Sequence, residues 1–280
     1  MSFRVIKGTF HVVGYSPDGD SIRFKALENA NWLLLDGKVR LNTKMHAQLR
    51  IEAIDTLETH YNGQHQPVEF ADAATEKLFS RLGISNVVWN AARSKVVSAE
   101  DGTAGFIISR MAEKNGRPVS FVFSGDQGFQ DGAEIFLDKK LARKSVNYKM
   151  LRDGLAYPTF YDGLFYDLRE LFSSQTQKAR AKKKGLWVAD TTNKYIQING
   201  LADVVDQDVL LPKLFRRIVT FLQQHEGFDA KQFVAFLAKS PEEVFILNRL
   251  HFTHFDNLIS VDENGRIKLS EKPEELVFLE

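Results

Sequence analysis

The order of the predicted secondary structure constrains the fold of this chain more than any other feature. Residues 9–15 and 21–25 are rich in β-branched and aromatic side chains, and the turn signal Ser16-Pro17-Asp18-Gly19 separates them. Residues 48–54 alternate between apolar and polar side chains, and an Asn115-Gly116 turn between residues 104–110 and 119–123 indicates a hairpin. Helical periodicity begins near Pro67 and returns at residues 146–152 and 166–184. This order, with strands first and helices later, predicts an antiparallel barrel with helices packed around it, and not a doubly wound sheet.

The C-terminal part of the sequence has a different pattern. Residues 189–197 are polar and are typical of a linker. Beyond them an apolar helical stripe runs over residues 211–222, the capping box Ser240-Pro241-Glu242-Glu243 predicts another helix, and Asn264-Gly265 predicts a hairpin. Nine of the 22 phenylalanines lie after residue 190, which indicates a packed core. We therefore expect two domains, residues 1–190 and 195–280, although a stripe packed permanently on the barrel would make the chain one cooperative unit.

The composition excludes several classes of protein. With 280 residues, 44% of them hydrophobic and 26% charged, the chain is ordinary for a globular protein of one or two domains. No apolar run approaches the roughly 20 residues of a membrane helix, and the absence of cysteine excludes disulfides and thiolate metal sites. The N-terminus shows no secretory signal, so we expect a cytoplasmic protein, although a secreted protein with its signal removed would look the same.

Charge is distributed unevenly along the chain. Residues 1–190 carry 27 basic and 22 acidic residues, whereas residues 191–280 carry 10 basic and 14 acidic residues. A mildly basic first part suits a polyanionic partner and an acidic tail does not. Ordinary surface variation would explain so small a difference equally well.

Three charged clusters lie in the first part of the chain, at residues 18–21, 50–58 and 114–117. Arg50 and Asp55 are an odd number of residues apart, so the chain must bend near Asp55 if both are to serve one site. Carboxylates brought together from Asp18, Asp20 and Asp55 could hold a hard cation such as calcium. A glutamate just beyond could accept a proton from water, and two arginines could hold a phosphate. Taken singly, each cluster is also ordinary turn chemistry.

The clusters resemble, in order and spacing, the motifs of the staphylococcal nuclease (thermonuclease) family. The resemblance covers about residues 8–187. The matching motifs are Asp18-Gly19-Asp20-Ser21, Arg50 with Asp55-Thr56-Leu57-Glu58, Lys114-Asn115-Gly116-Arg117, Val146-Asn147 with Gly154-Leu155-Ala156, and a final helix over Gln175–Trp187.

The resemblance implies an α+β protein. Residues 1–190 would form a five-stranded OB-fold β-barrel with three helices. Residues 195–280 would add a small helical domain that ends in a β-hairpin.

The resemblance also implies a role for individual residues. Calcium would be bound by Asp20, Asp55 and the carbonyl of Thr56, with magnesium or manganese as alternatives. Asp18 would contact these ligands without binding the metal ion itself. Glu58 would be the general base or would orient the attacking water. Arg50 and Arg117 would bind the phosphate and stabilise the transition state, and Lys114 and Tyr161 would contact the substrate.

The sequence departs from the family pattern at several uncharged positions. Ser21 replaces threonine, Leu57 replaces proline, Asn115 replaces tyrosine, and Pro118 directly follows Arg117. None of these changes removes a charged catalytic group.

We therefore expect a metal-dependent, sequence-nonspecific endonuclease acting on DNA or RNA, with single-stranded substrate favoured. One alternative is a module that binds nucleic acid or protein without catalysis. The other is a regulated toxin or defence effector, controlled by residues 195–280 through a homo-oligomer or a protein partner.

Overall fold

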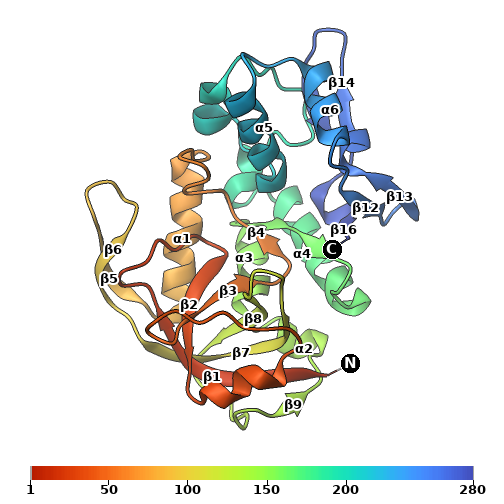
Figure 1. The fold of residues 1–280 in the computed structure, drawn as a ribbon. Helices are drawn as coiled ribbons and strands as arrows, with labels where there is room; N and C mark the ends of the chain where they lie inside the picture. Colours follow the sequence, from red (N-terminus) through yellow and green to blue (C-terminus); the bar gives the residue numbers. More distant parts are fainter. Residues whose placement is uncertain (1, 280) are drawn as a thin grey trace. The chain divides into compact units, whose positions relative to one another are not determined.

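A computed structural model describes residues 2–279 of the chain. The chain divides into two compact units, of which unit 1 comprises Met1–Glu52 and Ala74–Met150 and unit 2 comprises Ala53–Ala73 and Leu151–Glu280. Figure 1 labels the elements of both units. None of the helices within residues 2–279 combines the length and the apolar character needed to cross a bilayer.

Unit 1 contains a closed β-barrel (Figure 1). β1 pairs antiparallel with β2 and β7, β2 pairs antiparallel with β3, β3 pairs parallel with β8, and β8 returns antiparallel to β7. The five strands are β1 (Phe3–His11), β2 (Ser21–Ala26), β3 (Ala47–Ile51), β7 (Thr103–Ala112) and β8 (Pro118–Ser124). The predicted five-stranded OB-fold barrel and its Asn115-Gly116 hairpin are confirmed.

Apolar residues at alternate positions fill the barrel. Phe24, Leu49 and Val122 are fully buried, as the period-two pattern of their strands predicts. The rings of Phe106 and Phe123 stack with centroids 4.7 Å apart. Glycine is required at position 105, directly before Phe106, since a Cβ there would lie 2.4 Å from the carbonyl oxygen of Phe123.

Smaller elements surround the barrel strands in unit 1. The chain passes from one unit to the other inside α1 and again inside α3. The additional elements are η1 (Asn29–Leu34), α1 (Val68–Leu82), the hairpin of β5 (Ser85–Trp89) with β6 (Val96–Glu100), β9 (Glu134–Ile135), α2 (Lys139–Ala142) and α3 (Val146–Asp153).

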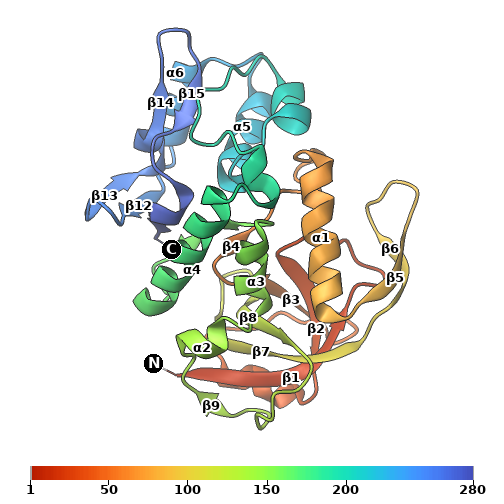
Figure 2. The ribbon, with the colours of Figure 1, turned by 180° about the vertical axis from the view of Figure 1, so that it is seen from behind.

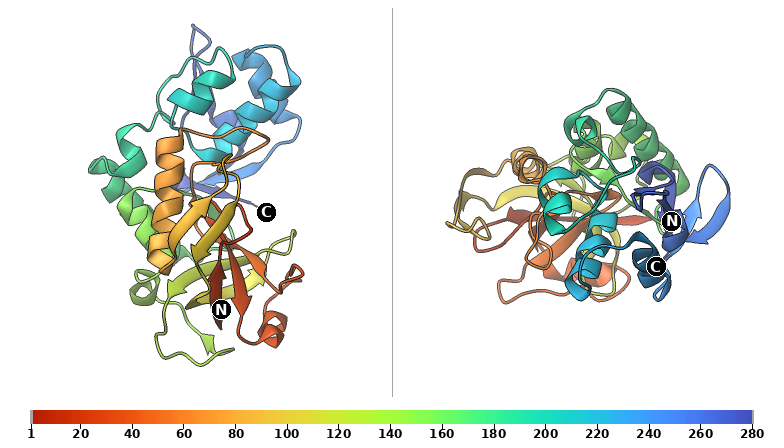
Figure 3. Two further views of the ribbon diagram at one scale, coloured as in Figure 1. Left: turned by 90° about the vertical axis from the view of Figure 1, so that its left-hand side faces the viewer. Right: turned by 90° about the horizontal axis from the view of Figure 1, so that it is seen from above.

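Unit 2 is built from helices and three small sheets, which can be followed in Figures 2 and 3. Its helices are α4 (Tyr166–Ala181), α5 (Pro212–Gln224) and α6 (Ala230–Ala238), with short helical turns at Gly185–Val188, Asp203–Gln207, Phe255–Leu258 and Pro273–Glu275. β4 (Ile54–Asp55) pairs with β10 (Tyr157–Pro158), and β14 (Ile259–Val261) forms the predicted hairpin with β15 (Ile267–Leu269). A four-stranded sheet follows the order β11 (Phe160–Tyr161), β16 (Leu276–Phe278), β12 (Glu243–Ile246) and β13 (His251–His254).

The sheet that holds β11 joins chain segments far apart in the sequence. β11 pairs in parallel with β16, with Phe160 opposite Val277. A single buried cluster contains Leu57, Tyr157 and Trp187 together with apolar residues between Ile196 and Phe278. The expected boundary near residue 190 therefore runs through one sheet and one hydrophobic core.

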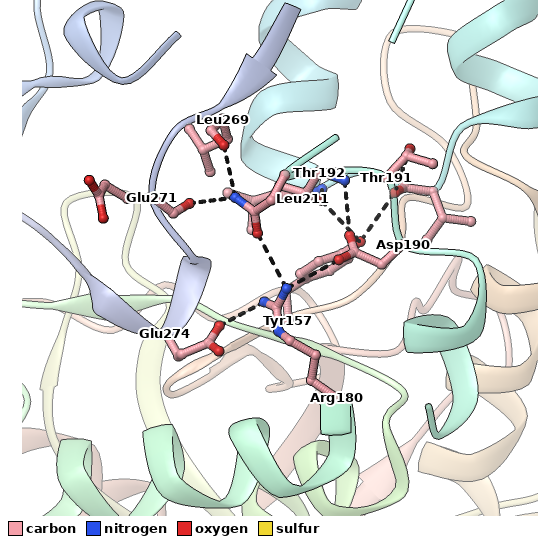
Figure 4. A network of polar contacts seen from close by, with 11 residues as sticks. Tyr157, Arg180, Asp190, Thr191, Thr192, Leu211, Leu269, Glu271 and Glu274 are labelled. Atoms are coloured by element: carbon pink, nitrogen blue, oxygen red, sulfur yellow. Dashed lines mark hydrogen bonds and ion pairs between the residues drawn. The ribbon is translucent and has the colours of Figure 1, made fainter. Parts of the chain in front are cut away.

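The segment 189–197, whose polar composition is typical of a linker, makes specific contacts with distant parts of unit 2. Figure 4 shows this segment within a network of polar contacts. Arg180 Nη1 donates to Asp190 Oδ2 at 3.3 Å, and its Nη2 donates to Glu274 Oε2 at 2.7 Å. Asn193 Nδ2 donates to the carbonyl oxygens of residues 269 and 271. The network ties α4 to the segment after β15.

The prediction of a helix after Ser240 is wrong, because Glu243–Ile246 forms strand β12. Val244 and Ile246 are buried at alternate positions, and β12 lies between β13 and β16. Sheet pairing on both edges outweighs the local capping signal.

Candidate functional site

The segment that carries the predicted acids bends away from the barrel strand. β3 ends at Ile51, Ala53 has a positive φ of 67°, and β4 begins at Ile54. This bend is the one that the odd spacing of Arg50 and Asp55 requires. Arg50 belongs to unit 1, whereas Asp55, Thr56 and Glu58 belong to unit 2.

In unit 2 the predicted metal ligand Asp55 and the predicted base Glu58 share one arginine. Arg216 Nη2 donates to Asp55 Oδ2 at 2.7 Å, and its Nη1 donates to Asp55 Oδ1 at 3.1 Å. Nη1 also donates to Glu58 Oε1. Burial alone would lower the pKa of the guanidinium, but the charges of Asp55 and Glu58 raise that pKa well above its usual value. The three side chains form an ion triad in which one cation serves two carboxylates.

The loop after Asp55 lies along helix α5. Arg216, Thr220 and Gln223 are spaced as one face of a helix. Thr220 Oγ1 lies 3.2 Å from the hydroxyl of Tyr61, and Gln223 Nε2 donates to the carbonyl of Asn62 at 3.0 Å. Gln66, fully buried, donates through Nε2 to the carbonyl of Leu210 and accepts a hydrogen bond from the backbone N–H of Glu58. These contacts fix the acid-bearing loop on the helix within unit 2.

Unit 1 brings Asp20, Arg50 and Arg117 to neighbouring strands. Arg50 lies opposite Ser21 on β2 and opposite Val119 on β8, and the backbone N–H of Ile51 donates to the carbonyl of Asp20 at 3.0 Å. Residues in register share one face of a sheet, so Arg50 and Val119 point to the same outer face. Arg117 lies two residues before Val119, in the turn that precedes β8.

Arg117 is held by an acid that the sequence did not point out. Its Nε donates to Glu113 Oε1 at 3.1 Å, and its backbone N–H donates to the same oxygen at 3.2 Å. Burial would raise the pKa of Glu113, but the hydrogen bonds and charge of Arg117 lower it below its usual value. Lys114 is exposed in the same turn.

The outer face of β1–β3 carries a cluster of cationic and aromatic side chains, which we call the basic face: His11, Tyr15, Arg23, Lys25, Lys44 and His46. Arg23 lies opposite His11 on β1 and opposite Gln48 on β3, so it continues the row of Arg50. The rings of His11 and His46 stack with centroids 4.2 Å apart, and the guanidinium of Arg23 lies 5.0 Å from the ring centre of Tyr15.

The basic face holds more positive charge than its acids balance. Burial, followed by the nearby His11, Lys25, Lys44 and Arg23, lowers the pKa of His46 to about 4, so its ring is neutral at pH 7. Among the described residues, the buried Nε of Arg23 has no hydrogen-bond acceptor. A buried donor without an acceptor is the kind of group that a bound anion satisfies.

The remaining predicted site residues lie as follows. Thr56 is buried beside Asp55 in unit 2. Tyr161 ends β11, with its ring centre 6.0 Å from that of Phe278 and 5.2 Å from Lys213 Nζ. Asp18 lies in the turn before β2, and its buried Oδ1 has no hydrogen-bond donor within residues 2–279.

In unit 2 the carboxylate of Asp55 is already engaged and offers a divalent cation no open ligand. Both oxygens of Asp55 accept hydrogen bonds from Arg216. Across residues 2–279, no group of three or more histidine, aspartate or glutamate side chains is arranged to hold a metal ion. Of the predicted site residues, Asp18 has a buried carboxylate oxygen, Oδ1, to which residues 2–279 offer no hydrogen-bond donor.

Two residues central to this geometry, Arg216 and Glu113, escaped the sequence analysis. Glu113 gave a local signal, because an acid and a base four residues apart enclose the Asn115-Gly116 turn. No local sequence signal pointed to Arg216, because the residues it pairs with lie more than 150 positions earlier in the chain.

Comparison with known proteins agrees with the fold. A family model described as staphylococcal nuclease homologue matches residues 48–189, about half of the chain. The matched part includes Arg50, Asp55, Glu58 and Arg117, and begins after Asp20. No curated protein matches the chain. The family is one of nucleases and nucleic-acid-binding barrels. With a closed five-stranded barrel and a match over half its length, the chain belongs to the staphylococcal nuclease homologue family.

Proposed function

We propose that the protein binds a single nucleic-acid strand on the outer face of its barrel and hydrolyses phosphodiester bonds in it. The observation that carries this proposal is the register of unit 1. β2 and β3 carry Arg23 and Arg50 on the same face, Arg23 lies opposite His11 on β1, and Arg117 directly precedes β8, where Val119 lies opposite Arg50.

The basic face supports binding of a strand with exposed bases. Lysine and arginine side chains neutralise phosphates, and aromatic rings offer surfaces on which bases stack. Tyr15, with Lys44 Nζ 5.7 Å from its ring centre, combines both properties. Lys25, on the same face, is exposed. A duplex would present fewer unstacked bases to such a surface, which favours a single strand.

For hydrolysis we propose in-line attack of water on the phosphorus. Arg50 and Arg117 would stabilise the negative charge of the five-coordinate state, and Glu58 would take the proton of the water. Lys114, three residues before Arg117, and Tyr161 remain proposed substrate contacts.

Calcium binding by Asp20, Asp55 and the carbonyl of Thr56, with Asp18 behind them, remains a prediction. It requires Asp55 to be released from Arg216, because both carboxylate oxygens are used in the triad.

The triad favours one alternative function. If Arg216 stays on both acids, neither Asp55 nor Glu58 is available for chemistry, and the barrel would bind nucleic acid without cutting it. A regulated effector with a partner bound through residues 195–280 has no comparable observation in its favour.

A direct assay separates these functions. Purified full-length protein is incubated with single- and double-stranded DNA and RNA, with EDTA, calcium, magnesium or manganese. Binding is measured in parallel at several salt concentrations. We expect cleavage, faster on single strands, together with binding that weakens as salt increases. Binding without cleavage under every condition would establish the non-catalytic alternative, and absence of both would refute the proposal.

Paired substitutions locate the binding surface. Arg23→Gln removes a cation from the basic face, whereas Lys140→Gln removes an exposed cation on α2, outside that face. We expect Arg23→Gln to weaken nucleic-acid binding several-fold. It should also reduce the slope of log affinity against log salt concentration by about 1, the value for one phosphate contact. Lys140→Gln should change neither the affinity nor the slope. Equal effects of the two substitutions would show that binding is spread over the whole surface.

A further inference from the structure

Arg216 occupies the place on the acids where the family resemblance leads one to expect a cation. Its two terminal nitrogens bind both oxygens of Asp55, and one of them also binds Glu58. A planar guanidinium matches a carboxylate in this two-pronged way, whereas a lysine would offer only a point charge.

The triad is part of the hydrophobic core of unit 2, and not a loose surface contact. α5 buries Leu214, Phe215 and Ile218 in the same cluster that holds Leu57, the residue directly before Glu58. The side chains of Asp55 and Glu58 are 8% and 14% exposed, against 27% for Arg216. The fold therefore sets the guanidinium against the acids before any substrate or metal binds.

Charge balance leaves the triad open to exchange. One guanidinium against two carboxylates gives these three side chains a net charge of −1, while Lys213 and Arg217 on the same helix share Glu242. A carboxylate pair that bound a divalent ion would be neutral.

Space for exchange exists beside the triad. A pocket of about 500 Å³ in unit 2 is lined by Arg216 itself, with Tyr61, Arg217, Thr220, Phe236 and Lys239 among its other walls. A side chain next to a cavity can change rotamer without repacking the core.

We propose that Arg216 is the resident cation of Asp55 and Glu58, and that a divalent cation binds these carboxylates only in place of Arg216. The proposal rests on the proposed function in one respect, namely that these two acids are the working groups of the site. It makes Arg216 a positioning residue that holds Asp55 and Glu58 together and limits the affinity of the site for metal.

The test is calcium binding, measured by calorimetry on the full chain at neutral pH. Because a ligand binds more weakly when its binding-competent state is rare, removal of Arg216 should strengthen calcium binding about tenfold or more. Arg216→Met removes the charge and keeps much of the volume. Arg216→Gln keeps an amide donor for the acids and provides a second test if the methionine variant does not fold.

Arg217→Met is the matched control. Arg217 is the next residue on α5, is 25% exposed, and pairs with Glu242 outside the triad. It should leave calcium affinity unchanged. Adding Asp55→Asn to Arg216→Met should abolish the gained affinity, which locates the metal on this acid.

The outcomes are separable from those of the nuclease assay. A gain in calcium affinity confined to the Arg216 variants supports the proposal, even if no variant cuts nucleic acid and the proposed function fails. Calcium affinity equal in the parent and in the folded Arg216 variants overturns it, even if the parent is an active nuclease.

Discussion

Replacing Arg216 by methionine leaves Asp55 and Glu58 without the guanidinium that joins them in unit 2. Removing one partner from a buried ion pair costs about 3–5 kcal/mol, because the remaining charge is left without compensation in a poorly solvated place. The Arg216 side chain is 27% exposed, so solvent screens part of the loss. We expect the free energy of unfolding to fall by about 3 kcal/mol, the lower end of that range.

Urea unfolding at pH 7, followed by circular dichroism, measures this loss. In a double-mutant cycle, Asp55→Asn removes one of the two charges that Arg216→Met leaves unpaired. The double variant should therefore be more stable than the sum of the two single losses predicts, by about 1–3 kcal/mol.

Arg217→Met is again the control, because Glu242 keeps Lys213 as a partner when Arg217 is lost. We expect it to cost about 1 kcal/mol, as for a partly exposed pair. An Arg216→Met protein within about 1 kcal/mol of the parent, or losses that simply add, would refute the buried-triad argument.

Four further predictions address catalysis, the basic face and the domain boundary. Glu58→Gln should lower single-turnover cleavage at least about 100-fold while strand binding survives; an unchanged rate would exclude Glu58 as the base. Arg50→Ala and Arg117→Ala should each slow the chemical step by about 100- to 1,000-fold, and a defect confined to affinity would make them binding residues only. The folded-state pKa of His46, about 4, lies below its usual 6.5, so unfolding takes up a proton between these values. Urea unfolding at several pH values should show that the free energy of unfolding decreases as the pH falls from 6.5 to about 4, and this decrease should be smaller in the His46→Gln variant. Residues 1–190 alone should unfold at a lower temperature than the full chain, because β11 loses β16; an unchanged midpoint would restore the boundary near residue 190.

The barrel could be predicted because its signals are local. Alternation along residues 48–54 and the Asn115-Gly116 turn specify strands and a hairpin with little help from the rest of the chain. The odd spacing of Arg50 and Asp55 likewise predicted a bend, which the structure places at Ala53 with its positive φ.

The ion triad and strand β12 could not be predicted, because both depend on contacts between residues far apart in the sequence. The apolar stripe of α5 was visible in the sequence, but it did not show which loop would meet the opposite, polar face. Arg216 could only be assigned to Asp55 once the fold was known. Similarly, Ser240 and Glu243 carry a sound capping signal, yet β13 and β16 provide pairing on both sides of β12, and tertiary structure prevails over local preference.

The pairing of β11 with β16 also bears on synthesis of the chain. Phe160 leaves the ribosome more than one hundred residues before its partner Val277. At translation rates of about 5–20 residues per second, this delay is roughly 6 to 20 seconds. During that time the strands of the barrel, the last of which ends at Ser124, are all available to one another. The apolar residues of unit 2 and its acidic loop are not yet covered at this stage. The nascent chain therefore has all the strands of its barrel but an incomplete hydrophobic core in unit 2, and exposed apolar residues of this kind are bound by chaperones.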